Sequence, residues 1–307
     1  MTLPGTTARP FGAVLTAMVT PMTESGAVDL DAAVKLATRL VDQGNDGLVL
    51  SGTTGEAPVT HAPEKADLVR AVVDAVGDRA VVLSGAGSND TAHAVRMAEQ
   101  AAEAGAHGLL VVSPYYSRPT QEGLYRHFAT VADSTDLPVM LYDIPGRAGV
   151  RIAPATYARI ATHPLVVAAK DATGDVASVP FLRQATGLAW YAGDDGLLLP
   201  FLAHGAAGIV SVSGHVVAPA FAEVVRRFDA GDHFGALEAF TGTLPVISAM
   251  NGAGAQAVMV KAALEILGVH TNRELRLPNV AATDDDVAAV RAALIAGGVL
   301  DAATTPQ

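Results

Sequence analysis

Short apolar runs alternate with longer amphipathic stretches along the first three quarters of the chain. The runs consist of Val, Leu, Ile and Ala at nearly every position, as expected for parallel strands that are buried on both faces. They predict strands at residues 13–19, 47–50, 80–84, 108–112, 139–142, 166–170, 188–191 and 208–212.

The stretches between these runs predict amphipathic helices. Several begin at a capping side chain and end at a glycine, as between Asp29 and Gly44 and between Asp90 and Gly105. The predicted helices include residues 29–43, 63–76, 91–104, 121–134 and 154–162.

Repeated strand–helix units over about 220 residues predict a closed (β/α)8 barrel, the TIM-barrel fold of the α/β class. An open, doubly wound sheet is the alternative that the same alternation allows. After about residue 230 the alternation stops, and helices are predicted at 233–250, 254–267 and 284–296. We therefore expect a catalytic barrel over residues 1–232 and a C-terminal helical domain over residues 233–307.

Composition supports a large core and argues against several classes of partner. Half of the 307 residues are hydrophobic and 17% are charged, so a barrel of this size can be filled. The most apolar region, residues 197–212, is broken by Pro200, His204 and glycines, so no transmembrane helix is expected. The net charge of −11, without a basic cluster, argues against nucleic acid and anionic membranes as partners.

Several apparent signals do not indicate cofactors. Cysteine is absent, and no two histidines have a spacing typical of metal ligands, so we expect no metal site. The glycines at 85–87 fit part of a dinucleotide fingerprint, but Asp90 replaces its third glycine, which favours a tight turn. We interpret Asp194-Asp195 as a helix cap rather than a catalytic pair. Residues 1–13 lack the pattern of a signal peptide, so a cytoplasmic protein is expected.

Candidate catalytic groups follow the predicted strands. In a parallel barrel the active site lies at the carboxyl ends of the strands. Residues 52–56 follow the second predicted strand, Tyr115 and Tyr116 the fourth, Tyr142 and Arg147 end or follow the fifth, and Lys170 ends the sixth. The sequence therefore brings these groups to one end of the barrel.

Lys170 carries the clearest chemistry. A lysine that ends a buried strand loses hydration, and a pKa depressed from ~10.4 toward ~7–8 yields a nucleophilic neutral amine. Such an amine attacks a ketone and forms an imine that withdraws electrons. Taken alone, a strand-end lysine that reaches solvent is the simpler interpretation. Its neighbours favour the chemical one.

The neighbouring groups fit the needs of imine chemistry. Tyr142, one strand earlier, can give and take protons near Lys170, although an aromatic plug is an alternative. Thr53 and Thr54 between glycines can form an anion nest, or an ordinary polar turn. Arg147 offers a forked donor for a second carboxylate, unless it is a surface residue.

Together these residues resemble the dihydrodipicolinate synthase family, among the pyruvate-dependent class I aldolases that include N-acetylneuraminate lyase. The resemblance runs from about residue 11 to residue 296. It rests on the segments 51–56, 113–119, 142–147, 170–171, 193–195 and 208–212.

The resemblance implies a mechanism for this chain. Lys170 would form a Schiff base with pyruvate, and Tyr142 would transfer protons through Thr53 to Tyr116. In the family that last tyrosine comes from the neighbouring subunit, so the active site would need at least a dimer. Family members are usually tetramers, so the resemblance implies a homotetramer built as a dimer of dimers. The family needs neither a metal nor a diffusible cofactor.

The resemblance also assigns substrate contacts. Thr54 would bind the pyruvate carboxylate and Arg147 the carboxylate of L-aspartate 4-semialdehyde, while Gly193 and the Val210 carbonyl would border the pocket. The product would be 4-hydroxy-tetrahydrodipicolinate, for lysine and diaminopimelate biosynthesis. An alternative is a lyase for a sugar acid or hydroxy-oxo-acid, although Arg147 favours a carboxylate-bearing aldehyde. A catalytically silent barrel that binds a keto acid is an alternative of another class.

One region departs from the family pattern. Lysine-inhibited members carry a serine, histidines and a glutamate after the segment equivalent to 51–56 and on the next helix. This chain has Ala57-Pro58, Ala62, Lys65 and His93 there, although Asn89 and Tyr115 fit. A cationic Lys65 would repel a cationic effector, so we expect weak or absent inhibition by lysine.

Overall fold

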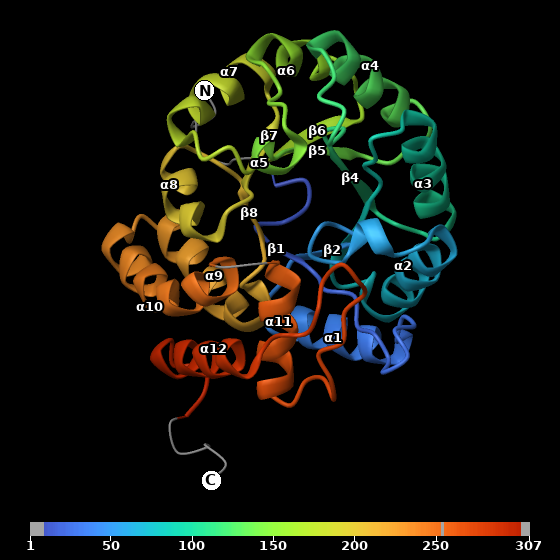
Figure 1. Cartoon of the computed structure of the whole chain (residues 1–307). Helices are drawn as coiled ribbons and strands as arrows, with labels where there is room; N and C mark the ends of the chain where they lie inside the picture. The colour runs from blue at the N-terminus through green and yellow to red at the C-terminus, as the bar shows by residue number, and fades with distance from the viewer. Residues whose placement is uncertain (1–8, 253–254, 302–307) are drawn as a thin grey trace.

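The computed structural model describes residues 9–252 and 255–301. Its parallel strands close into a barrel in chain order, with β8 paired to β1 (Figure 1). This confirms the predicted barrel and excludes the open sheet. The strands are β1 Val14–Ala17, β2 Gly47–Leu50, β3 Val81–Gly85, β4 Gly108–Val112, β5 Val139–Asp143, β6 Val166–Asp171, β7 Ala189–Ala192 and β8 Gly208–Ser211.

Helices surround the barrel, and their ends agree with the predicted ends to within two residues wherever a helix was predicted among the described residues. Asp29 and Asp90 cap their helices through hydrogen bonds from Ala32 N and Ala92 N, as expected. The helices are α1 Leu30–Asp42, α2 Ala62–Val76, α3 Thr91–Glu103, α4 Gln121–Ala132, α5 Pro145–Ala148, α6 Pro154–Ile160, α7 Val179–Thr186, α8 Leu198–Ala203 and α9 Gly214–Asp229, with 3-10 turns at Ala57–Val59, Val176–Ser178 and Asp195–Leu197.

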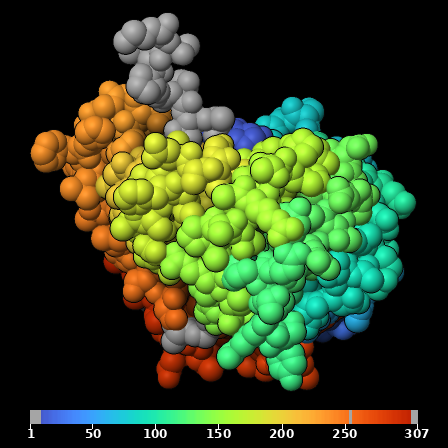
Figure 2. Space-filling view, turned by 90° about the horizontal axis from the view of Figure 1, so that it is seen from above, coloured from blue at the N-terminus to red at the C-terminus, as the bar shows by residue number. Residues whose placement is uncertain are grey.

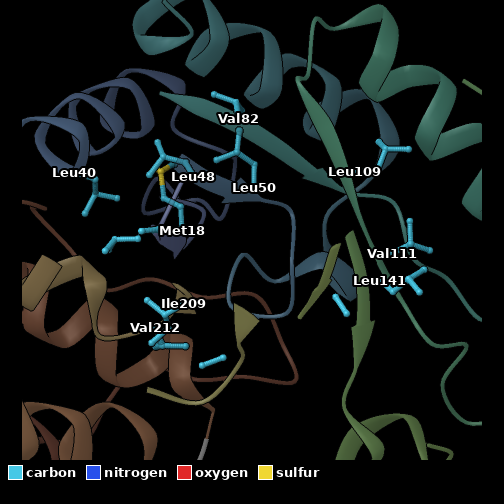
Figure 3. Close-up of a cluster of buried hydrophobic side chains, with 14 of the residues drawn as sticks. Met18, Leu40, Leu48, Leu50, Val82, Leu109, Val111, Leu141, Ile209 and Val212 are labelled. Carbon is cyan, nitrogen blue, oxygen red and sulfur yellow. The ribbon is translucent and has the colours of Figure 1, made fainter. Parts of the chain in front are cut away.

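Alternation along each strand divides the core into two layers. Leu48 and Leu50 point outward into the layer between strands and helices, where they lie near Met18 and Val82 (Figure 3). Val49, between them in the sequence, belongs to the barrel interior. The continuous apolar runs therefore reflect strands that are buried on both faces.

The amino end of the barrel is closed by Phe11 and Tyr191. Phe11 is 2% exposed and lies in the interior cluster. The Tyr191 hydroxyl donates to Gly12 O at 2.9 Å and accepts from Phe11 N at 3.3 Å. Among the described residues these side chains fill this end, whereas the candidate groups lie at the carboxyl ends of the strands.

A C-terminal appendage follows α9. It comprises α10 His233–Asn251, α11 Gln256–Ile266 and α12 Asp284–Ala296, and residue 254, where the second of these helices was predicted to begin, lies outside the described residues. Figures 1 and 2 show these helices in orange and red along one side of the barrel. Phe240 and Val246 of α10 belong to the same hydrophobic cluster as Phe221 of α9. The appendage thus shares the outer core, and the division at residue 232 stays a prediction.

Candidate active site

Lys170 and Tyr142 lie side by side inside the carboxyl end of the barrel. The register of β5 and β6 pairs them directly, and alternation turns both inward, as it does Met140 and Ala168 two residues earlier. The Lys170 Nζ lies 4.3 Å from the centroid of the Tyr142 ring. The two residues are only 4% and 5% exposed, so the amine and the phenol share a dry environment.

Burial shifts the pKa of both groups. It lowers the pKa of Lys170 from 10.5 to about 8, while the nearby Asp195 carboxylate opposes this change and the Arg147 guanidinium adds to it. Burial raises the pKa of Tyr142 well above its ordinary value of 10, with partial opposition from Arg147. At neutral pH the site therefore holds an amine that is readily deprotonated beside a phenol that keeps its proton.

Asp195 is a structural link rather than half of a carboxylate pair. Its carboxylate is buried and accepts hydrogen bonds from Val212 N at 3.1 Å, Ser213 N at 2.6 Å and Asn251 Nδ2 at 3.0 Å. Asp194 instead caps the following turn by accepting from Gly196 N, which confirms capping for that residue alone. The link between Asp195 and α10 has no signal in the local sequence.

A cavity of about 730 Å³ opens at the carboxyl ends of β2 to β5. Thr53, Tyr142 and Arg147 border it. The cavity continues between α2 and α3, where Lys65 and His93 form its other wall. Lys170, Thr54, Gly193, Val210 and Tyr116 are not among the described residues that border it.

The loop after β2 has an unusual backbone. Ser51 and Glu56 adopt the left-handed conformation, with φ of 52° and 58°. Thr53 is exposed whereas Thr54 is buried. A Cβ on Gly85 of β3 would lie 2.2 Å from Ser51 O, so only glycine allows the loop to approach this closely.

The loop also presents free hydrogen-bond donors. Among the described residues, no acceptor is bonded to the backbone N–H groups of Thr53, Thr54 and Gly55. The Ser51 hydroxyl is buried, borders the cavity and has no partner in this part of the structure. Successive unpaired N–H groups form the kind of concavity that binds an anion.

Gly193 and Val210 lie on the other side of Lys170 from Tyr142. Gly193 follows β7, donates its N–H to Asp171 O at 2.8 Å, and a Cβ there would lie 3.0 Å from the same oxygen. Val210 is fully buried in the barrel interior and pairs with Leu15. Their strands, β7 and β8, follow β6 in the order of the barrel.

Tyr116 and Arg147 point to the outside of this buried centre. Tyr116 is 90% exposed, with a φ of 72°, and the chain does not bring it to Lys170. Arg147, on the short helix α5, is exposed at the cavity. Thr53 and Tyr142 share the cavity, although no hydrogen bond joins their hydroxyls within the described residues.

Two buried carboxylates stand behind the reactive pair, and sequence reasoning missed their environment. Asp143 and Asp171 follow Tyr142 and Lys170, so alternation turns them outward. Asp171 accepts from Trp190 Nε1 at 2.9 Å, and Asp143 accepts from the Tyr157 hydroxyl at 3.3 Å. Burial, reinforced by the charge of Asp171, raises the pKa of Asp143 to about 7, against the hydrogen bond from Ile152 N.

The described residues contain no group of three histidine, aspartate or glutamate side chains that could hold a metal ion. Within the same residues, no helix has the length and apolar character needed to cross a membrane.

Comparisons with known proteins show which family the chain resembles. The family model described as the dihydrodipicolinate synthetase family matches residues 10–296. A 4-hydroxy-tetrahydrodipicolinate synthase from Kineococcus radiotolerans is 54% identical over 294 residues, which cover 96% of each chain.

Solved structures of similar proteins share the fold. One from Cyanidioschyzon merolae, determined with lysine bound, has a TM-score of 0.92 and 36% identity, covering 95% of this chain and all of that one. Another, from Acinetobacter baumannii in complex with pyruvate, has a TM-score of 0.90 and 32% identity, covering 94% of this chain and all of that one.

Proposed function

The chain belongs to the dihydrodipicolinate synthetase family, and we infer that it condenses pyruvate with L-aspartate 4-semialdehyde to give 4-hydroxy-tetrahydrodipicolinate. It is a lyase of the class I aldolase type, and its product serves lysine and diaminopimelate biosynthesis. The observation that carries this conclusion is the buried Lys170 amine, held 4.3 Å from the ring of Tyr142.

Lys170 begins the reaction as a nucleophile. Its neutral amine attacks the ketone carbon of pyruvate, and the carbinolamine loses water to give the imine. The Tyr142 phenol, which burial keeps protonated, donates the proton that leaves with this water and recovers it in a later step. Loss of a proton from the pyruvate methyl group then gives an enamine.

The enamine carbon forms the new carbon–carbon bond with the aldehyde of the second substrate. The aldehyde oxygen takes up a proton and becomes the hydroxyl group of the product. The amino group of the same substrate then attacks the imine carbon and displaces Lys170, which closes the ring. One molecule of water is released overall, and the free amine of Lys170 is regenerated.

Hydrogen-bond donors at the carboxyl end of the barrel suit the two carboxylates. Thr54, with the unpaired N–H groups of its loop, would hold the pyruvate carboxylate. Arg147, exposed at the cavity, would bind the carboxylate of aspartate semialdehyde. The aldehyde released from a sugar acid would not require a guanidinium at that place. Gly193 and the Val210 carbonyl would border the imine from β7 and β8.

The exposure of Tyr116 supports an oligomer. The Tyr116 side chain is 90% exposed and its backbone is in the left-handed region, with a φ of 72°. We propose that Tyr116 completes the proton path through Thr53 and Tyr142 in a neighbouring copy. The working form would then be a homotetramer, a dimer of dimers, and we place it in the cytoplasm.

Borohydride trapping tests the reaction. Folded protein is incubated with pyruvate, reduced and digested, and we expect a reduced pyruvyl adduct on the peptide that contains Lys170. Lys170→Arg should abolish the adduct and the condensation, while Lys35→Arg, at an exposed position of α1, should change neither. Absence of an adduct in the folded wild-type protein would remove the imine mechanism.

A further inference from the structure

A buried ion pair joins the C-terminal appendage to the loop that follows β2. The Nζ of Lys261, on α11, lies 2.6 Å from the Glu56 Oε1, across 205 positions of sequence. The two side chains are 2% and 0% exposed. The Lys261 amine also donates to Glu274 O at 2.7 Å, so a second hydrogen bond fixes its position.

The same appendage binds this loop through its backbone. Arg276 N donates to the second carboxylate oxygen of Glu56 at 3.0 Å. The Arg276 guanidinium donates to Val59 O at 2.9 Å and forms an ion pair with Glu64 of α2. In Figure 1 the segment after α11 accordingly runs up toward β2 and α2.

Glu56 is held in a conformation that its neighbours must maintain. Its φ of 58° lies in the left-handed region, which a residue with a side chain rarely adopts. Such residues persist where the surroundings over-determine them, and they cluster at functional sites. In Glu56 the fixed part is the carboxylate, which is bonded to Lys261 and Arg276.

Stability alone accounts poorly for this arrangement. Removing two charges from water is costly, and a buried ion pair is often no more stabilising than apolar residues of the same volume. Such pairs are better suited to fixing one arrangement of the groups attached to them. The group attached here is the turn 53–56, in which the N–H groups of Thr53, Thr54 and Gly55 have no bonded acceptor among the described residues.

We propose that Lys261 is a positioning residue for the carboxylate site of pyruvate. Through Glu56 it fixes the turn that carries Thr53 and Thr54, so that their donors meet the carboxylate of the bound keto acid. The inference rests on the proposed function of this loop. It adds a requirement that lies outside the barrel, in the appendage.

The test uses the full-length double variant Glu56→Gln/Lys261→Met, because removing one partner alone would leave a buried unpaired charge. We expect the KM for pyruvate to rise about tenfold or more, the lower end of what a hydrogen bond to a charged group contributes. The kcat at saturating pyruvate should stay within about twofold of the wild-type value, since the Lys170 and Tyr142 pair is untouched.

A neutral ketone separates positioning from general damage. The rate of borohydride-trapped adduct formation is compared for pyruvate and for methyl pyruvate, which lacks the carboxylate charge. The variant should lose its preference for pyruvate by the same factor as the KM rises. An equal loss with both ketones, or an unchanged KM in a folded variant, would overturn the proposal.

A matched control lies in the same appendage. The carboxylate–guanidinium pair Glu265 and Arg273 makes, within the described residues, no hydrogen bond or ion pair with the loop after β2. Glu265→Gln/Arg273→Met should keep the wild-type KM, and an equal rise there would also overturn the proposal. If wild-type protein forms no adduct with pyruvate, the proposed function fails instead.

Discussion

The rate of imine formation should follow the titration of Lys170. Because one pKa unit corresponds to about 1.4 kcal/mol, lowering the pKa from 10.5 to about 8 disfavours the ammonium form by about 3 kcal/mol. At pH 7 about 9% of the amine is then neutral, compared with about 0.03% for an unshifted lysine. Burial thus supplies roughly 300 times more nucleophile at neutral pH.

The assay measures adduct formation at subsaturating pyruvate, without aldehyde, by quenching with borohydride at each pH. The pH dependence of this second-order rate constant reports the ionisation of groups in the free enzyme. It should rise about 90-fold between pH 6 and pH 9 and level off above pH 8. Tyr142→Phe keeps the ring over the amine but loses the proton donor, so its curve should level at the same pH with a lower plateau.

Two results would refute this reasoning. A rate that climbs about tenfold per pH unit through pH 9.5 would mean an unshifted lysine, whose rise over the same range is roughly 1000-fold. A rate that is flat from pH 6 to pH 9 would mean that the limiting step does not depend on the protonation state of the Lys170 amine. In either case burial beside Tyr142 would not be the source of the reactivity of Lys170.

Three further predictions concern other groups. Arg147→Ala should lower kcat/KM for aspartate semialdehyde about tenfold or more, from the loss of a charged hydrogen bond, while the pyruvate adduct still forms; unchanged condensation kinetics would contradict its assignment. The pKa of Asp143 is about 7 in the folded protein and 3.8 ordinarily, so the folded state binds the proton more tightly and the unfolding free energy falls as pH rises from about 4 to 7. Denaturant titrations at several pH values should show that Asp143→Asn removes a fall of up to about 4 kcal/mol. Parallel plots of unfolding free energy against pH for wild type and variant would exclude this. Added lysine should leave the condensation rate nearly unchanged, because Lys65, which borders the cavity beside His93, would repel a cationic effector. Inhibition at sub-millimolar lysine would show that this repulsion is unimportant.

The fold was predictable because its signal is local. Eight apolar runs that alternate with amphipathic stretches predicted parallel strands buried on both faces, and the pairing of β8 with β1 then distinguishes the closed barrel from the open sheet. The adjacency of Tyr142 and Lys170 followed as well, since consecutive strands are neighbours and both residues end their strands. For these two residues, the order of the strands along the chain is enough to predict that they are neighbours.

Contacts between distant segments were not predictable in the same way. Asp195 binds Asn251, and Glu56 binds Lys261, yet no periodicity or spacing marks these partners. The outward turn of Asp143 was implied by alternation, but its raised pKa depends on residues from β6 and on the segment before α6. Such environments arise only when the whole chain has packed.

Trp190 gives the protein a reporter of its own chemistry. It is the single tryptophan of the chain, is fully buried, and donates its indole N–H to the carboxylate that immediately follows Lys170. Indole emission depends on its hydrogen bond and on nearby charges, and both belong here to the strand that carries the nucleophile. Substrate addition can therefore be followed by intrinsic fluorescence in real time, in unlabelled protein and without a coupling enzyme.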